Sequence, residues 1–291
     1  MRGFDKKLLS KMFAFSGWAF LGNGVVVLKE QGSSVLLNLF GGPAVNAAQG
    51  IAMQVNAAVY SFVSNFMIAS NPQITKNCAA GDLNSMHSLI IRSEKYGFCI
   101  LLIILLPLCA GINYVLRLWL VDVPAHTTNF IVLILLYSLI ECFVSPLTTG
   151  VLAQGKIKSF EIALTFIYLG NFISSYICLK IGMAVESVFV LNIIFKFFVL
   201  VALLLHSHSK YSFPIARFFR ECLLPSLLVF LVSALFVYVL PGKDTLSLGI
   251  FVVRTLAIAT FTCVAVFVIG MAKRERLYVK KLLKEKVCSK I

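Results

Sequence analysis

Eight long apolar stretches follow one another along the chain and are separated by shorter polar connections. Each stretch reaches the ~20 residues that an α-helix needs to cross the hydrocarbon core of a bilayer. The pattern therefore predicts an all-α fold, a polytopic transmembrane helix bundle with about eight spans. The expected spans cover residues 13–37, 46–70, 97–118, 128–152, 160–180, 184–205, 222–240 and 247–271.

Composition agrees with this pattern, because 59% of the residues are apolar and 13% are charged, against roughly 25% charged in soluble domains. The net charge of +14 is at first sight typical of a nucleic-acid binder. However, twenty of the 26 Lys and Arg residues fall on one side of the predicted topology and five on the other. The positive-inside rule then places both termini in the cytoplasm. Topology accounts for the charge, so we expect no nucleic acid as a partner.

The chain is expected to divide at the basic, Pro-containing segment that follows residue 205. Residues 1–205 would form a six-span lobe, residues 206–272 two additional spans, and residues 273–291 a basic tail. Partial amphipathicity suits the tail to anionic headgroups, although a solvated cytoplasmic tail explains the same lysines. The eight cysteines lack metal-ligand spacing and mostly fall in or beside spans, so neither a metal site nor a disulfide framework is expected.

The first two predicted spans carry many more amide side chains than the other six, among them Gln31, Asn56 and Asn65. Unsatisfied polar groups are costly in hydrocarbon, so these helices cannot face lipid on every side. Small and polar residues share one face of the second span. That face fits a tight helix–helix seam or the wall of a water-filled cavity, and the sequence leaves both readings open.

Three ionisable residues lie well inside predicted spans. Lys196 is near the middle of the sixth span, Glu141 is near the middle of the fourth, and Lys29 is ~25 Å along the first. Such residues are rare in membranes, usually face the bundle interior and are candidates for function. Lys196 and Glu141 could form a structural pair, or Lys196 could contact an anionic substrate while Glu141 exchanges a coupling proton or cation. Lys29 either snorkels outward or faces a cavity.

The polar stretch from Ala69 to Lys95 is expected to be a hinge at the cytoplasmic face. Pro72 would bend or stop the second span, and Lys76 would mark the membrane interface. Asp82 is suited to cap a short amphipathic helix that lies at the headgroup level and leads into the third span.

Several segments resemble the bacterial polysaccharide-biosynthesis (O-antigen) flippases of the multidrug/oligosaccharidyl-lipid/polysaccharide exporter superfamily. The resemblance covers nearly the whole chain and is most specific between residues 36 and 95. The segments that carry it are "GW" at 17–18, "LLNLFGGPAVNAAQGIAMQVNAAV" at 36–59, "NPQITKNCAAGDLNSMHSLIIRSEK" at 71–95 and "GKIK" at 155–158.

This resemblance implies a multi-pass protein of the bacterial inner membrane that flips undecaprenyl-pyrophosphate-linked oligosaccharides by alternating access between two lobes. Its implied partners are the lipid-linked oligosaccharide and membrane lipids, and no cofactor or catalytic residue is implied. The pyrophosphate calls for cations and amides along the pathway.

The family normally has two six-helix lobes, and this sequence resembles the second lobe with two extra spans. The first lobe is therefore expected on another chain, or the reading frame is truncated. The expected pathway residues are Lys196, Lys29, Gln31, Asn56 and Asn65, with Glu141 as the coupling or ion-pair residue.

Three alternatives compete with a flippase. One is a cation-coupled small-molecule antiporter of the same superfamily, and another is a nonfunctional fragment. The third, a membrane-embedded glycosyltransferase or polymerase, is disfavoured because the predicted outer connections are short. Those connections cover residues 38–45, 119–127, 181–183 and 241–246. No catalytic triad, Walker loop or dinucleotide turn is present in the sequence, so we expect no enzyme.

Overall fold

A computed structural model describes residues 6–155, 157–240, 248–272 and 275–277, and all regular secondary structure in these ranges is helical. Six of the helices are long and apolar enough to cross a membrane, or up to seven if α2 and α3 form one span. The all-α fold is thus confirmed for the described residues, and its long apolar helices are compatible with a helical membrane bundle. The elements are α1 (Lys6–Ala79), α2 (Leu83–Ala110), α3 (Ile112–Trp119), α4 (Thr127–Ala153), α5 (Lys158–Lys180), α6 (Ser187–Tyr211), α7 (Ile215–Phe218), the π-helical η1 (Phe219–Leu223), α8 (Leu224–Val239), α9 (Leu248–Ala265) and the π-helical η2 (Val266–Gly270).

Helix α1 contains the first two predicted spans and is sharply kinked between them. The connection expected at residues 38–45 is wrong, because Gly42 alone leaves the helical conformation, with φ 79° and ψ −179°. This backbone region is open essentially only to glycine. Pro43 follows directly and starts the next helical turn, where its missing N–H costs nothing. We call residues 6–41 the first arm of α1 and residues 43–79 its second arm.

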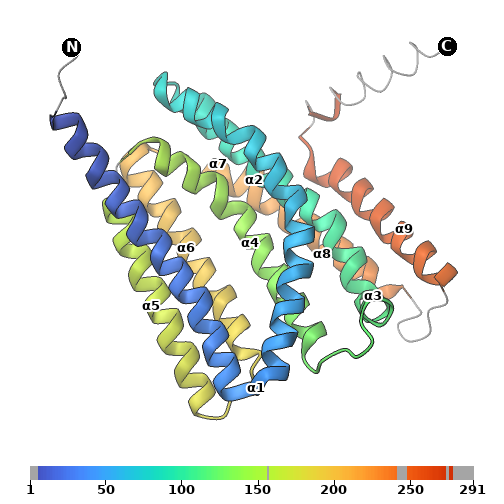
Figure 1. Cartoon of the computed structure of the whole chain (residues 1–291). Helices are drawn as coiled ribbons and strands as arrows, with labels where there is room; N and C mark the ends of the chain where they lie inside the picture. Colours follow the sequence, from blue (N-terminus) through green and yellow to red (C-terminus); the bar gives the residue numbers. More distant parts are fainter. Residues whose placement is uncertain (1–5, 156, 241–247, 273–274, 278–291) are drawn as a thin grey trace, which may run out of the picture.

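The two arms of α1 form a V, and α8 and α9 lie outside it, beyond the second arm (Figure 1). Helix α1 packs against α2, α4 and α5, while α6 packs against α4 and α5. Helices α8 and α9 pack against each other and against α2. The start of α1 and the end of η2 lie at the same end of the bundle (Figure 1).

Helix α2 differs from the expected short surface helix that leads into a separate span. It runs without interruption from Leu83 to Ala110, and a bend of 74° at Gly111 separates it from α3. The third predicted span, residues 97–118, is therefore broken near its end. Asp82 takes the N-cap position that the sequence predicts, and its carboxylate accepts a hydrogen bond of 3.0 Å from the amide of Ser85.

Helix α6 continues to Tyr211, beyond residue 205, where the sequence placed the end of the sixth span. Ser212, with φ 54°, ends that helix, and Pro214 precedes α7. From there α7, η1 and α8 follow one another without a loop. The expected connection at residues 241–246 lies outside the described residues. Most of the expected tail, residues 273–291, also lies outside them, and 275–277 is its described part.

The connection between α5 and α6 is tied to the start of α4 by Glu186. Its Oε1 atom lies 2.6 Å from Nδ1 of His126 and accepts a 3.1 Å hydrogen bond from Nδ2 of Asn129. Partial burial raises the pKa of the Glu186 carboxyl, but the hydrogen bonds from His126 and Asn129 outweigh it and leave the pKa below its ordinary value of 4.5. The ionised carboxylate therefore stabilises the native connection.

We expect E186Q to be less stable than the wild type at neutral pH by at most about 1 kcal/mol, the range of exposed ion pairs. Because the pKa of Glu186 is lower in the native protein than in the unfolded chain, the carboxylate stabilises the native protein above about pH 4.5. This stabilisation is lost as the pH falls through the pKa of Glu186 in the native protein. The difference in melting temperature between the two proteins should therefore close below about pH 4.5. Thermal unfolding in detergent over a range of pH measures it. If the melting temperatures of E186Q and the wild type differed by the same amount at all pH values, the ionised carboxylate of Glu186 would not be the source of the stability.

Candidate functional site: a charged cavity inside the bundle

The centre of the site is an ion pair between helices α4 and α6. The Nζ atom of Lys196 contacts Oε2 of Glu141, and the two side chains are 6% and 26% exposed. Sequence position alone left a structural pair as one of two readings, and the structure contains that pair. Because Glu141 is the more exposed partner, it is also the one that a proton or cation reaches from the cavity.

Tyr137, which the sequence did not single out, lies between two lysines. The Nζ atom of Lys29 is 5.0 Å from the centroid of its ring, and that of Lys196 is 5.2 Å from it. Cations at these distances are attracted by the negative face of an aromatic ring. Lys29 therefore faces the bundle interior and does not snorkel outward. For Tyr137, the available signal in the sequence was its position four residues before Glu141 on α4, because such residues share a helix face.

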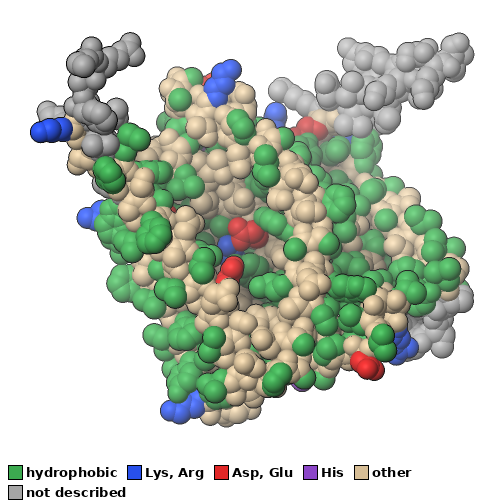
Figure 2. Space-filling view, in the orientation of Figure 1, with side chains coloured by type: hydrophobic (Ala, Val, Ile, Leu, Met, Phe, Trp, Pro, Cys, Tyr) green, Lys and Arg blue, Asp and Glu red, His purple; other side chains and the backbone are tan. Residues whose placement is uncertain are grey.

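Two neighbouring cavities open along this cluster. The larger, of about 490 Å³, is lined by Lys196, Glu141 and Tyr137, together with Glu30 and Glu161. The smaller, of about 120 Å³, shares Tyr137 and Glu30. Figure 2 shows charged side chains within a hollow in the middle of the face of the molecule that is in view. A volume of 300–1,000 Å³ is typical of ligand pockets, so the larger cavity can hold a sizeable polar group.

The polar residues that line the smaller cavity include Lys29 and three amide side chains: Gln49 and Asn56 in the second arm of α1, and Asn192 in α6. Oδ1 of Asn56 accepts a 2.7 Å hydrogen bond from Ser138. Oε1 of Gln49 and Oδ1 of Asn192 are buried and have no hydrogen-bond partner among the described residues. Such acceptors suit the hydroxyl groups of a ligand, because buried polar atoms are normally paired.

Not every predicted residue joins the cluster. Gln31 lines a third cavity of about 270 Å³, which shares Glu30, Gln49 and Met53 with the smaller one. Asn65 is exposed and lines none of these three cavities. It therefore lies apart from the residues that were expected to share its pathway.

The three expected hinge residues are also outside the cavity. Pro72 does not stop the helix, because the second arm of α1 continues to Ala79. Lys76 lies exposed in the last turn of α1, followed by the turn at Gly81, where φ is 75°. Together with the Asp82 cap, these residues define how the chain passes from α1 to α2.

Charge inside the two neighbouring cavities is unevenly distributed. Three carboxylates, from Glu30, Glu141 and Glu161, face two ammonium groups, from Lys29 and Lys196. Glu30 and Glu161 were not expected at the site, because Glu30 follows Lys29 directly and Glu161 falls at the start of a helix. The arrangement can therefore bind an anion at the lysines only when a carboxylate is neutralised, and it can bind protons or cations at the carboxylates.

Comparison with family models gives no match to the chain. Searches among curated proteins and among solved structures also give no match.

Proposed function

We propose that the chain is a membrane transporter that moves undecaprenyl-pyrophosphate-linked oligosaccharides across the bacterial inner membrane. The observation that carries the proposal is the Lys196–Glu141 ion pair at the wall of a 490 Å³ cavity inside the bundle. Buried ion pairs are weak devices for stability, since the desolvation of both charges offsets their attraction. A pair that opens onto a cavity is better explained by exchange of its partners.

In this proposal the pyrophosphate takes the place of Glu141 beside Lys196. Protonation of Glu141 removes its charge, and the freed ammonium group then pairs with the phosphate oxygens, which are strong acceptors. Lys29, on the other side of Tyr137, supplies a second positive charge. The amides of Gln49, Asn56 and Asn192 bind sugar hydroxyl groups. Release of the proton restores the original ion pair and expels the anion.

Alternating access requires two bodies that move against each other. The chain in this proposal supplies one lobe, and a second lobe on another chain completes the pathway. The cavity then faces the partner lobe across the open side of the α1 V. Substrate binding does not require the second lobe, and this separates the test of the site from the test of transport.

A cation-coupled antiporter is the second candidate, and the excess of carboxylates over lysines in the cavity favours it. In that case Glu30, Glu141 and Glu161 would bind an organic cation, and the lysines would only balance charge. The two candidates differ in the sign of the ligand. They can therefore be separated by offering the purified chain a lipid-linked oligosaccharide and an amphipathic cation.

Binding of the lipid-linked oligosaccharide to the purified full chain, followed by native mass spectrometry in detergent, tests the proposal. We expect K29Q and K196Q each to weaken binding by about tenfold to a hundredfold, because hydrogen bonds to charged groups contribute roughly 1.5–3 kcal/mol. The matched control K180Q removes an exposed lysine at the end of α5 and should bind as the wild type does. Equal binding by all four proteins would refute the flippase assignment. Binding of the cation alone, lost in E141Q and E161Q, would establish the antiporter.

A further inference from the structure

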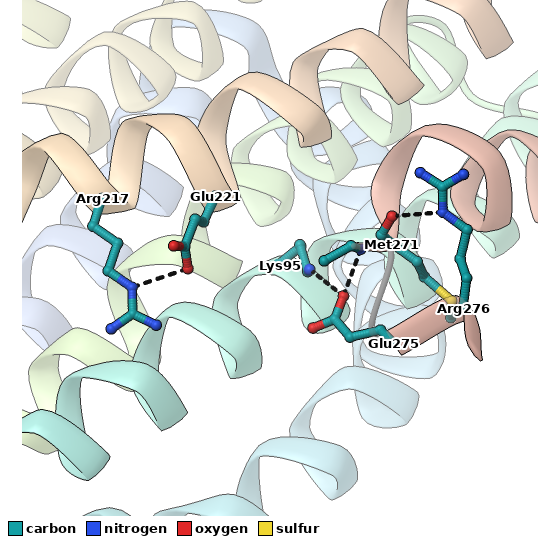
Figure 3. A network of polar contacts seen from close by, with 7 residues as sticks. Lys95, Arg217, Glu221, Met271, Glu275 and Arg276 are labelled. Carbon is teal, nitrogen blue, oxygen red and sulfur yellow. Dashed lines mark hydrogen bonds and ion pairs between the residues drawn. The ribbon is translucent and has the colours of Figure 1, made fainter. Parts of the chain in front are cut away.

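A further cavity, of about 400 Å³, lies apart from the three described above, at the end of the bundle where η2 ends and α7 begins. Three segments that are far apart in the sequence meet there: α2, the α7–η1 segment and the residues that follow η2 (Figure 3). None of its lining residues takes part in the charged cavity described above. It therefore requires an explanation of its own.

The charged residues of this cavity are mostly basic. Arg92, Lys95, Arg217 and Arg220 line it together with two carboxylates, those of Glu221 and Glu275, which leaves two more cations than anions. Each carboxylate is already engaged, since Lys95 contacts Glu275 at 2.8 Å and Arg217 contacts Glu221 at 3.0 Å. Both ion pairs point into the same region (Figure 3).

Glu275 is firmly held in its ionised form. Partial burial raises its pKa, but hydrogen bonds from Lys95 and from the Ala272 amide lower it more, so the pKa stays below 4.5. Arg276 closes the same turn by donating a hydrogen bond of 3.0 Å from Nε to the carbonyl oxygen of Met271. The carboxylate therefore neutralises Lys95 at neutral pH and fixes the chain that follows η2 against α2.

Arg217 is oriented by two contacts. Its Nε atom donates to Glu221, and its Nη1 atom donates a 3.0 Å hydrogen bond to Oγ of Ser88 on α2. By contrast, Arg92 and Arg220 are exposed and form no hydrogen bond or ion pair with another residue in the described ranges. These two guanidinium groups, one from α2 and one from η1, carry the uncompensated charge of the cavity.

The remaining wall is apolar and is formed by Ile91, Pro225, Ile269 and Met271. A cavity lined by two free guanidinium groups and by apolar side chains matches an amphiphile with an anionic head. Guanidinium groups pair with phosphate oxygens through two parallel hydrogen bonds. Basic pockets between transmembrane helices are also typical sites for anionic lipid headgroups.

We infer that the cavity between α2, η1 and the end of η2 binds a phosphate group, supplied by the headgroup of an anionic membrane lipid, through Arg92 and Arg220. The acyl chains of the lipid run along the apolar wall. Because this site is separate from the ion pair of Lys196 and Glu141, it goes beyond the proposed transport function and can be tested without it.

The test measures binding of phosphatidylglycerol to the purified full chain by native mass spectrometry, with phosphatidylcholine as the zwitterionic comparison. We expect the double variant R92Q/R220Q to bind phosphatidylglycerol at least about tenfold more weakly than the wild type, since each cation near a lipid surface contributes a several-fold factor. The control R117Q/K180Q removes the same charge from exposed residues elsewhere on the chain and should bind as the wild type does. The variant R92K/R220K keeps the charge but loses the paired hydrogen bonds, and it should fall between the two.

Inorganic phosphate, titrated against the complex with phosphatidylglycerol, separates the two sources of the phosphate group. If phosphate, at concentrations that saturate the lipid-free protein, fails to displace the lipid, and the bound lipid still depends on Arg92 and Arg220, the source is the lipid headgroup. If phosphate alone binds with the same dependence on Arg92 and Arg220 while the lipid does not, the lipid source is overturned. Equal loss of lipid in R92Q/R220Q and R117Q/K180Q, or equal binding of both lipids by the wild type, would overturn the site itself.

Discussion

Replacing Glu141 with Gln is expected to lower the free energy of unfolding by about 3–5 kcal/mol, the cost of leaving one partner of a buried ion pair without its counter-charge. The remaining partner, Lys196, has a side chain that is only 6% exposed. Its Nζ atom also lies 5.2 Å from the centroid of the Tyr137 ring, and a cation–π contact contributes only about 0.5–2 kcal/mol. Denaturant titration of the purified variant in detergent micelles measures the loss.

The reciprocal variant K196M should cost less, because Glu141 is 26% exposed and can take up a proton from the cavity. The double variant E141Q/K196M should recover most of the lost stability, since replacement of both charges removes the desolvation penalty together with the attraction. K196M and the double variant should lose binding of the lipid-linked oligosaccharide, whereas E141Q, which imitates the protonated carboxyl and leaves Lys196 free, should keep it. A double variant as unstable as E141Q would show that the pair is not the source of the loss.

Replacing Gly42 with Ala is expected to lower the free energy of unfolding by about 1–3 kcal/mol, the cost of holding a residue with a side chain in a backbone region reserved for glycine. The kink at Gly42 sets the angle between the two arms of α1, and both arms contribute residues to the smaller cavity. The strained variant should therefore also bind the lipid-linked oligosaccharide more weakly. Unfolding in micelles and native mass spectrometry measure the two effects.

The matched control is G24A, in the first arm of α1. A Cβ atom added there meets open space, and the backbone is helical. Alanine in a helix interior is favoured over glycine by roughly 0.5–1 kcal/mol, so this variant should be at least as stable as the wild type. If G42A and G24A were equally stable, the kink would not depend on the conformational freedom of glycine.

The spans were predictable from the sequence because an isolated apolar stretch in lipid can pair all of its backbone N–H and C=O groups only as an α-helix. Helix α4, for example, covers residues 127–153 where apolar residues predicted 128–152. The breaks were harder to predict. Gly-Gly-Pro after residue 40 indicated a connection, but a single residue bends the chain while the helix continues on both sides. Continuation is favoured in a membrane, since each additional unpaired backbone group is costly there.

The ion pair of the candidate site followed from the depth of its residues in the membrane, since two opposite charges far from water have few other partners. Tyr137 and Glu161 could not be found in this way. An aromatic residue in an apolar span has the same appearance whether it packs in a core or faces lysines. Likewise, a carboxylate in the first turn of a helix is usually explained by the helix dipole. Apart from the helix face that Tyr137 shares with Glu141, it is their convergence in three dimensions that distinguishes them.

Helix α9 is fastened at both ends to the segment formed by α2 and α3. At one end, Glu275, just beyond η2, contacts Lys95, and at the other, Phe251 stacks on Tyr114 of α3 with ring centroids 4.6 Å apart. The bend at Gly111 brings that second contact within reach. Two anchors at opposite ends suppress both sliding and pivoting. In any rocking motion of the bundle, α8 and α9 would therefore move together with α2 as one rigid body. A displacement at the Lys95 end of α2 would then be transmitted to its other end, at Gly111.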